Sequence, residues 1–223
     1  MLAGVGAPLI ATATASAGFL GIKVVAKDNE FGLLVANVYA EFDRPGEDFM
    51  QAVAGTANAP LLIQIGGGGV FYNNAFGSNI APNLAFIGIA PSLAFDTFVT
   101  IGAKVDNLPD FGDATIITPG LPNLTGTQIS TDASGWAVTP LDAQWDPFNS
   151  DYGGPGNGQI LIGQYSTIDN GPGTTISGTF LIQYITNGDN QQSVVSFFLV
   201  PTPGALALLG VAGLVGTRRR RRA

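Results

Sequence analysis

The strongest constraint on the fold is a pair of candidate strands joined by an Asn-Gly turn near the C-terminal end. Residues 177–186, SGTFLIQYIT, alternate in side-chain character as a strand with one core-facing side does. Asn187-Gly188 follows, and this dipeptide favours two-residue hairpin turns because both positions adopt positive φ. Residues 192–200 then return as a second strand, so the sequence predicts a long antiparallel hairpin.

The chain that precedes this hairpin shows the same character. Short alternating or β-branched runs recur between turn-rich gaps, and 31 glycines and 14 prolines supply the turns. No long segment before residue 200 repeats its apolar residues with the helical period of about 3.6 residues. We therefore predict an all-β fold, a β-sandwich or jelly-roll-like body over residues 18–199. The main candidate strands are residues 18–27, 31–42, 61–65, 85–89, 95–102, 115–117, 127–130, 136–139 and 157–165.

The chain contains no histidine and no cysteine. This composition excludes histidine bases, thiol nucleophiles and the usual zinc or iron ligand sets, and it favours a non-enzymatic function. All 16 acidic residues lie before the C-terminal tail, where only Lys23, Lys27, Arg44 and Lys104 oppose them, so the body has a net charge of −12. A surface of this sign repels nucleic acid, and we expect no nucleic-acid partner.

Residues 1–17, MLAGVGAPLIATATASA, have features of a secretory signal peptide. An apolar run spans residues 2–10, and Ala15-Ser16-Ala17 fits the small-x-small rule for cleavage before Gly18. No lysine or arginine precedes the apolar run, so either the start codon is misassigned and a basic front is missing, or the signal is weak. The alternative is that these residues form a disordered terminus or an edge strand.

The last residues of the chain form a tail of three parts. Val200, Pro201, Thr202 and Pro203 come first, and because each proline fixes its own φ and restricts the preceding residue, the last strand cannot continue past residue 200. Residues 204–217 carry no charge, and we predict that they form a single transmembrane helix. Its anchoring side chains are Leu206, Leu208, Leu209, Val211, Leu214 and Val215. A stop-transfer cluster of five arginines follows, Arg218, Arg219, Arg220, Arg221 and Arg222.

Length and charge decide how this helix would lie in a membrane. Residues 204–217 span about 21 Å as a helix, which is less than the hydrocarbon core of about 30 Å, and the arginines can snorkel to the far headgroups to complete the span. The arginine cluster stays in the cytoplasm, so the body lies outside. The alternative is a C-terminal core helix followed by a solvated basic tag, but such a helix would have a polar face, and this segment has none.

This three-part order resembles the bacterial PEP-CTERM sorting signal: a Val-Pro-x-Pro tetrapeptide, a short Gly/Ala/Leu-rich transmembrane helix and a terminal arginine cluster. The family usually has glutamate where this chain has Thr202. The resemblance implies that an exosortase, a membrane transpeptidase-like enzyme, recognises and removes the tail near residues 200–203, and that the protein is exported to the cell envelope or an extracellular matrix. Residues 38–48 and 91–102 also resemble segments of exported planctomycete-type proteins that carry this tail.

Three clusters of oxygen-bearing side chains are candidate calcium sites, because calcium prefers six to eight oxygen ligands. None matches a known calcium-loop pattern, and solvated loop carboxylates are the alternative for each cluster. Calcium is the only cofactor that the sequence suggests. The clusters are Asp43, Glu47 and Asp48; Asp106, Asp110 and Asp113; and Asp142, Asp146, Asn149 and Asp151, of which the last is the first to test.

Two functions stay open besides that of an exported structural protein. The first is a calcium-assisted carbohydrate-binding module with an extracellular polysaccharide as its partner, in which Trp136, Trp145, Tyr152 and Tyr165 stack on sugar rings. Against this function, the aromatic residues of a β-sandwich more often fill the core. The second is a glycan hydrolase that uses a pair of carboxylates. No histidine is present to assist a serine nucleophile, although Ser-Lys pairs remain formally possible.

Overall fold

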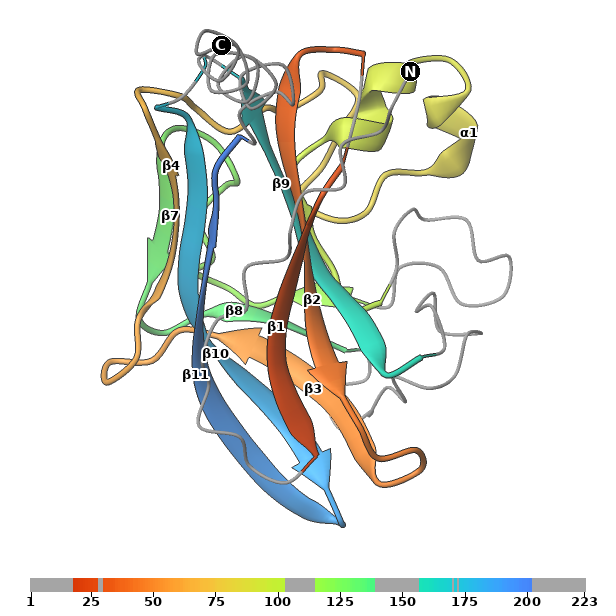
Figure 1. The fold of residues 1–223 in the computed structure, drawn as a ribbon, viewed down its shortest axis with the longest axis vertical. Helices are drawn as coiled ribbons and strands as arrows, with labels where there is room; N and C mark the ends of the chain where they lie inside the picture. Colours follow the sequence, from red (N-terminus) through yellow and green to blue (C-terminus); the bar gives the residue numbers. More distant parts are fainter. Residues whose placement is uncertain are drawn as a thin grey trace, which may run out of the picture.

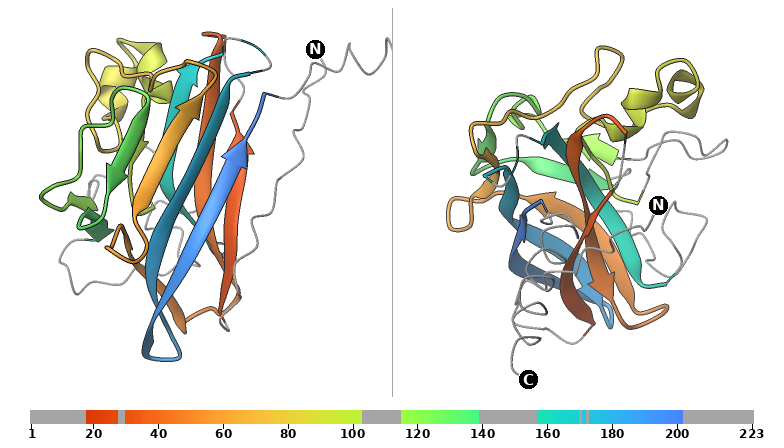
Figure 2. Two further views of the ribbon diagram at one scale, coloured as in Figure 1. Left: turned by 90° about the vertical axis from the view of Figure 1, so that its left-hand side faces the viewer. Right: turned by 45° about the horizontal axis from the view of Figure 1, so that its top comes forward.

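The computed structural model describes residues 18–27, 30–102, 115–138, 157–169, 171 and 173–201. These residues form an all-β fold whose strands are arranged in two antiparallel sheets (Figure 1). The two sheets face each other across one core, as in a β-sandwich, and Figure 2 shows the arrangement from two further directions. The prediction of an all-β body is confirmed.

The smaller sheet has four strands in the order β1-β2-β9-β5. They are β1 (Phe19–Ala26), β2 (Leu33–Phe42), β9 (Gln159–Ile168) and β5 (Phe98–Val99). The larger sheet has seven strands, six of them in the order β6-β8-β3-β10-β4-β7, with β11 on the free side of β10. They are β6 (Thr115–Ile117), β8 (Gly135–Val138), β3 (Asp48–Ala54), β10 (Thr175–Thr186), β4 (Leu61–Gly66), β7 (Gln128–Thr131) and β11 (Asp189–Leu199).

The predicted hairpin is the β10–β11 pair, and β10 is the central strand of the larger sheet. Asn187 and Gly188 adopt φ values of 52° and 82° at the turn. Positive φ at both central residues is what this kind of two-residue hairpin turn requires. One side of β10 pairs with β11 along almost its whole length. The other side pairs first with β4 and then with β3, so this one strand joins both halves of the sheet.

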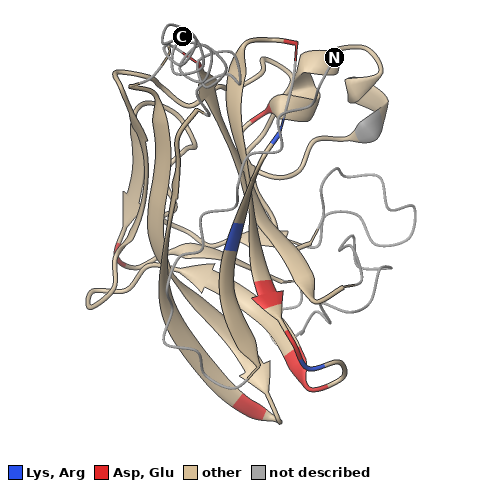
Figure 3. Ribbon diagram, in the orientation of Figure 1, with Lys and Arg blue, Asp and Glu red and all other residues tan. Residues whose placement is uncertain are grey.

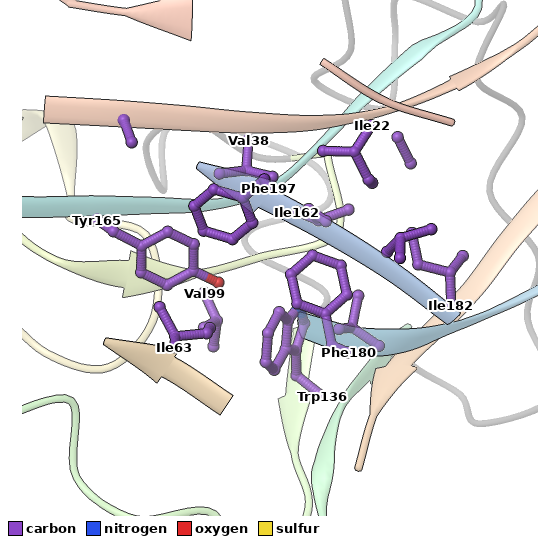
Figure 4. Packing of buried hydrophobic residues seen from close by; sticks show 14 of the residues in the cluster. Ile22, Val38, Ile63, Val99, Trp136, Ile162, Tyr165, Phe180, Ile182 and Phe197 are labelled. Carbon is purple, nitrogen blue, oxygen red and sulfur yellow. The ribbon is translucent and has the colours of Figure 1, made fainter. Parts of the chain in front are cut away.

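The core between the sheets is filled by large side chains from both of them (Figure 4). Phe180 and Tyr184 of β10, Tyr165 of β9 and Trp136 of β8 are at most 1% exposed. Phe197 of β11 completes the group, because its ring stacks on Tyr165 at 5.9 Å and also contacts Phe180. Burying side chains of this size supplies about 1.5–3 kcal/mol each, which is the main stabilisation available to a chain without disulfides.

One predicted strand is wrong and a second is wrong in part. Residues 85–89 were expected in a strand, but they overlap the short helix α1 (Leu84–Ile87). The Asn83 side chain caps this helix, because its Oδ1 accepts a hydrogen bond from the Ala85 amide at 2.8 Å. Residues 95–102 were expected to form one long strand. Instead, Phe95 ends a 3-10 helix, η1 (Pro91–Phe95), and the strand is limited to Phe98–Val99. The strand starts late because Asp96 and Thr97 use their side chains to bind the backbone of other segments.

The chain between β4 and β5 makes an excursion that we call the α1 lobe, residues 70–97. It lies at one end of the sandwich (Figure 1), against the outer face of the smaller sheet. A small second cluster marks this packing, in which Ala81 of the lobe meets Tyr39, Phe98 and Leu161 of the sheet. The Gln164 side chain of β9 also donates to the backbone oxygens within the lobe, so the lobe is fastened to the sheet by polar as well as apolar contacts.

No helix in the described part of the chain is long and apolar enough to cross a membrane. The predicted transmembrane helix over residues 204–217 lies outside the described residues.

Candidate functional site

The point where the tail leaves the body is the first candidate site. β11 ends at Leu199, and the first residue of the tetrapeptide, Val200, is 37% exposed. Pro201 is half-buried and is the last described residue. The body therefore runs directly into the tetrapeptide without a linker. Thr202, Pro203, the predicted membrane segment and the arginine cluster lie outside the described residues.

The predicted cleavage point lies at the opposite end of the sandwich from the tail. Phe19 begins β1 and is fully buried, so cleavage before Gly18 would remove no residue of the sheet. Gly18 has a φ of +110°, and a Cβ there would overlap Asp48 Oδ1 and the hydroxyl of Thr186. The body thus accepts only glycine comfortably at this position.

The first acidic cluster, Asp43, Glu47 and Asp48, does not converge on a common point. Asp48 is fully buried and accepts hydrogen bonds from the Thr186 hydroxyl at 2.6 Å and from the Arg44 amide at 2.9 Å. Glu47 instead faces the Arg44 guanidinium at 3.9 Å. Among the residues that the structure describes, no three groups of the kinds that ligate metals lie together. The other two clusters, including Asp142, Asp146, Asn149 and Asp151, lie outside the described residues.

A shallow groove of ≈ 390 Å³ runs over the outer face of the larger sheet where β3, β8 and β10 lie side by side. Its floor is low because the strands present alanine and glycine there. The bulge in β3 also lies here: Ala52 pairs with Gln183 and Met50 pairs with Tyr184, so Gln51 between them has no partner residue on β10. The lining residues are Gln51, Ala52, Val53, Ala54, Gly55, Thr56, Thr118, Ala133, Ser134, Gly135, Trp136, Ala137 and Gln183.

The groove offers only neutral hydrogen-bonding groups among its polar side chains. None of its lining residues is charged, and its polar groups are amides and hydroxyls. Ser134 is held in a local network, since its hydroxyl bonds to the Thr118 backbone oxygen at 3.1 Å and lies 3.0 Å from the Thr118 hydroxyl. A surface of this kind suits neutral hydrogen-bonding ligands such as sugar hydroxyls or peptide groups.

Trp136 and Tyr165 do not stack on sugar rings, which the alternative function of carbohydrate binding would require, and instead fill the core, as the sequence analysis favoured. Trp136 is 1% exposed and its indole N–H donates to the Thr100 oxygen at 3.1 Å within the body. Tyr165 is fully buried, and this burial raises the pKa of its hydroxyl above the ordinary value. Both rings fill the core, as aromatic residues of sandwiches commonly do. Trp145 and Tyr152 lie outside the described residues.

Asp96 is a buried carboxylate that the sequence analysis did not single out. Burial raises its pKa to about 6, although backbone hydrogen bonds from Asn74, Thr97 and Ser78 act in the opposite direction. Its Oδ1 accepts from the Asn74 amide at 2.7 Å, and Gly77 lies so close that a Cβ there would overlap Oδ2. Asp96 therefore fixes the first turn of the α1 lobe to the end of η1.

A signal for Asp96 was present in the sequence. Between Asp48 and Asp96 no charged residue occurs, so the carboxylate ends a long uncharged stretch. The groove had no comparable signal, because its residues come from three strands that are far apart in the sequence.

Comparison with known proteins gives no further assignment for this site. No family model matches the chain, no curated protein is similar to it, and no solved structure matches its fold.

Proposed function

We propose that this chain is an exported, non-enzymatic protein of the cell envelope or extracellular matrix, whose C-terminal tail inserts in the membrane and is then processed by an exosortase-type enzyme. The observation that carries the proposal is the order of the tail: Val-Pro-Thr-Pro, an uncharged segment over residues 204–217, and five arginines. Each part has a separate physical role, because the prolines end the sheet, the apolar segment enters lipid and the arginines remain in the cytoplasm.

The body has features that suit this role. Its last strand ends one residue before the tetrapeptide, and Val200 is exposed, so an enzyme at the membrane could reach the chain without unfolding the sandwich. Its first strand begins one residue after the predicted cleavage point.

The test is mass spectrometry of both termini of the protein isolated from its own host. A mature form that begins at Gly18 and ends near Val200 would support the proposal. A variant in which Arg218 to Arg222 are replaced by serine should remain unprocessed, because the arginines no longer fix the orientation of the segment. A matched control replaces the four basic residues of the body, Lys23, Lys27, Arg44 and Lys104, and should be processed normally.

Recovery of extracellular protein with Arg222 still attached would overturn the proposal of processing. Recovery of the intact chain from the cytoplasm would overturn the proposal of export. The two results are distinguishable, because the first retains a mature N-terminus at Gly18 whereas the second retains Met1.

A second candidate function is binding of a neutral polysaccharide, which the groove over β3, β8 and β10 favours. Its uncharged lining of amides and hydroxyls offers donors and acceptors without a charge that would have to be desolvated. A glycan array probed with and without calcium tests this function. Silence under both conditions would count against it.

A further inference from the structure

The α1 lobe exposes large apolar side chains to solvent. Phe76 is 69% exposed, Phe86 is 52% exposed and Ile89 is 78% exposed. Single exposed apolar residues are common on soluble proteins, but a group of them on one projecting feature marks a surface that meets a partner.

These three side chains are held by one scaffold. The Ile89 amide donates to the Phe86 oxygen at 3.0 Å, so Ile89 is held in the turn that directly follows α1. The turn that carries Phe76 is tied to η1 by Asn74, whose side chain donates to the Ser92 hydroxyl at 2.9 Å. Because α1 and η1 also pack against each other, the lobe presents its apolar side chains from a fixed frame.

The surface of the lobe carries no exposed charge. Residues 49–95 contain no lysine, arginine, aspartate or glutamate, so most of the lobe is uncoloured in Figure 3. Asp96 is buried. This contrasts with the net charge of −12 for the body as a whole. An uncharged apolar surface can enter the boundary between headgroups and acyl chains without the cost of desolvating a charge, and Phe and Ile are residues that favour this boundary or the acyl region.

The lobe lies at the end of the sandwich from which the tail leaves. In Figure 1 β11 rises from the lower hairpin to its last residues at the upper end, where the α1 lobe also projects, and the side view in Figure 2 agrees. The chain from Pro201 to the start of the predicted membrane segment at residue 204 spans at most about 11 Å. The upper end of the sandwich is therefore held close to the membrane for as long as the tail is inserted.

We propose that the α1 lobe docks on the lipid surface of the bilayer that the tail enters, with Phe76, Phe86 and Ile89 placed in the boundary between headgroups and acyl chains. This inference rests on the proposed function, because the tail brings the lobe to the membrane. A second contact beside the tail would restrict rocking of the body, and it would hold residues 200–203 at one height above the bilayer for the processing enzyme.

The experiment uses the full chain, reconstituted in vesicles of phosphatidylethanolamine and phosphatidylglycerol that contain a lipid with a nitroxide on its acyl chain. The chain has no cysteine, so a single introduced cysteine can be labelled uniquely with a fluorophore. Ala85→Cys places the label on the exposed side of the lobe and leaves Phe86 intact, and Asn190→Cys is the matched control in the hairpin at the far end. We expect several-fold stronger quenching by the nitroxide lipid at position 85 than at position 190.

A second set of proteins carries Phe76→Ser, Phe86→Ser and Ile89→Ser together with each label. We expect quenching at position 85 to fall to the level of the control, while co-sedimentation with the vesicles through the tail is unchanged. Circular dichroism of the triple variant checks that the sheets persist.

Four results would overturn the inference. Co-sedimentation without quenching at position 85 would overturn it and leave the tail proposal standing. Quenching that survives the triple substitution would show that these side chains do not make the contact. Self-quenching at position 85 in vesicles without nitroxide would show that the lobe meets a second copy of the chain instead of lipid. A chain that does not co-sediment at all would overturn both the tail proposal and the inference built on it.

Discussion

Replacement of Gly18 by alanine tests whether the start of the folded body is set by packing. The residue has a φ of +110°, which costs an L-amino acid with a side chain on the order of 1–2 kcal/mol. A Cβ would also overlap Asp48 Oδ1 and Thr186 Oγ1, which are joined by a buried hydrogen bond of 2.6 Å. Loss of such a bond costs a further 1–3 kcal/mol approximately. We therefore expect Gly18→Ala to lower the free energy of unfolding by about 3 kcal/mol, or the Tm by roughly 6–12 °C in a body of this size.

Gly46→Ala is the matched control, because Gly46 has a φ of +73° but no atom lies within 4 Å of the position of its Cβ. It should show only the backbone strain, about 1 kcal/mol. Both variants can be compared with the unchanged protein by urea unfolding, followed through the fluorescence of the tryptophans, of which Trp136 is buried. Equal losses for the two variants would refute the reasoning, since the contact with Asp48 and Thr186 would then contribute nothing.

Two further predictions concern buried carboxylates. The pKa of Asp96 is raised to about 6 from 3.8, so the folded state binds this proton more tightly than the unfolded state, and the stabilisation is present below about pH 4 and is lost as the pH rises through 6. The loss is at most about 3 kcal/mol. Urea unfolding of the protein and of its Asp96→Asn variant measures it, because the difference between their free energies of unfolding should change by this amount between about pH 4 and pH 7. A difference that stays constant with pH would contradict the prediction. The second prediction concerns Asp48, which forms no ion pair with any described lysine or arginine. In a chain that begins at Gly18, the charged amino group is bonded to the Gly18 Cα, which lies close to the Asp48 carboxylate. The Tm of this chain should fall when the amino group is acetylated, and it should fall less in an Asp48→Asn background. Equal changes in the two backgrounds would count against an ion pair between the amino group and Asp48.

The sequence was informative where local chemistry decides the conformation. The β10–β11 hairpin could be predicted because Asn187-Gly188 imposes the turn and the alternation of the strands imposes one buried face. The buried face of β10 followed from the same alternation. These features depend only on residues adjacent in the chain, so the three-dimensional structure added little to them.

The α1 lobe could not be predicted in the same way. Residues 85–89 form a short apolar run, and such runs do not distinguish a strand from a buried helical turn. The cap from Asn83 was a local signal for the helix, but the role of Asp96 depends on Asn74 and Gly77, which lie some twenty residues earlier. Likewise the groove exists only because β3 pairs with β10 on one side and with β8 on the other, and these three strands are far apart in the sequence. Contacts between distant segments decided each of these features.

The distribution of charge gives the docked orientation an electrostatic rationale. Figure 3 shows acidic segments in the turn between β2 and β3 and at the β10–β11 turn, at the lower end, where the exposed carboxylates among the described residues are Asp43, Glu47 and Asp189. At the other end of β2 and β9, the described exposed carboxylates are Glu30 and Asp169. The twelve residues of β10 extend about 40 Å at 3.3 Å each. This length is several times the Debye length of about 8 Å at physiological ionic strength, so the carboxylates of the lower end scarcely interact with an anionic bilayer. Reversal of the sandwich would instead bring them to the surface, where each opposed charge costs on the order of 1 kcal/mol. Among the residues that the structure describes, the end that carries the apolar lobe and the tail is therefore also the end with fewer exposed carboxylates, two against three.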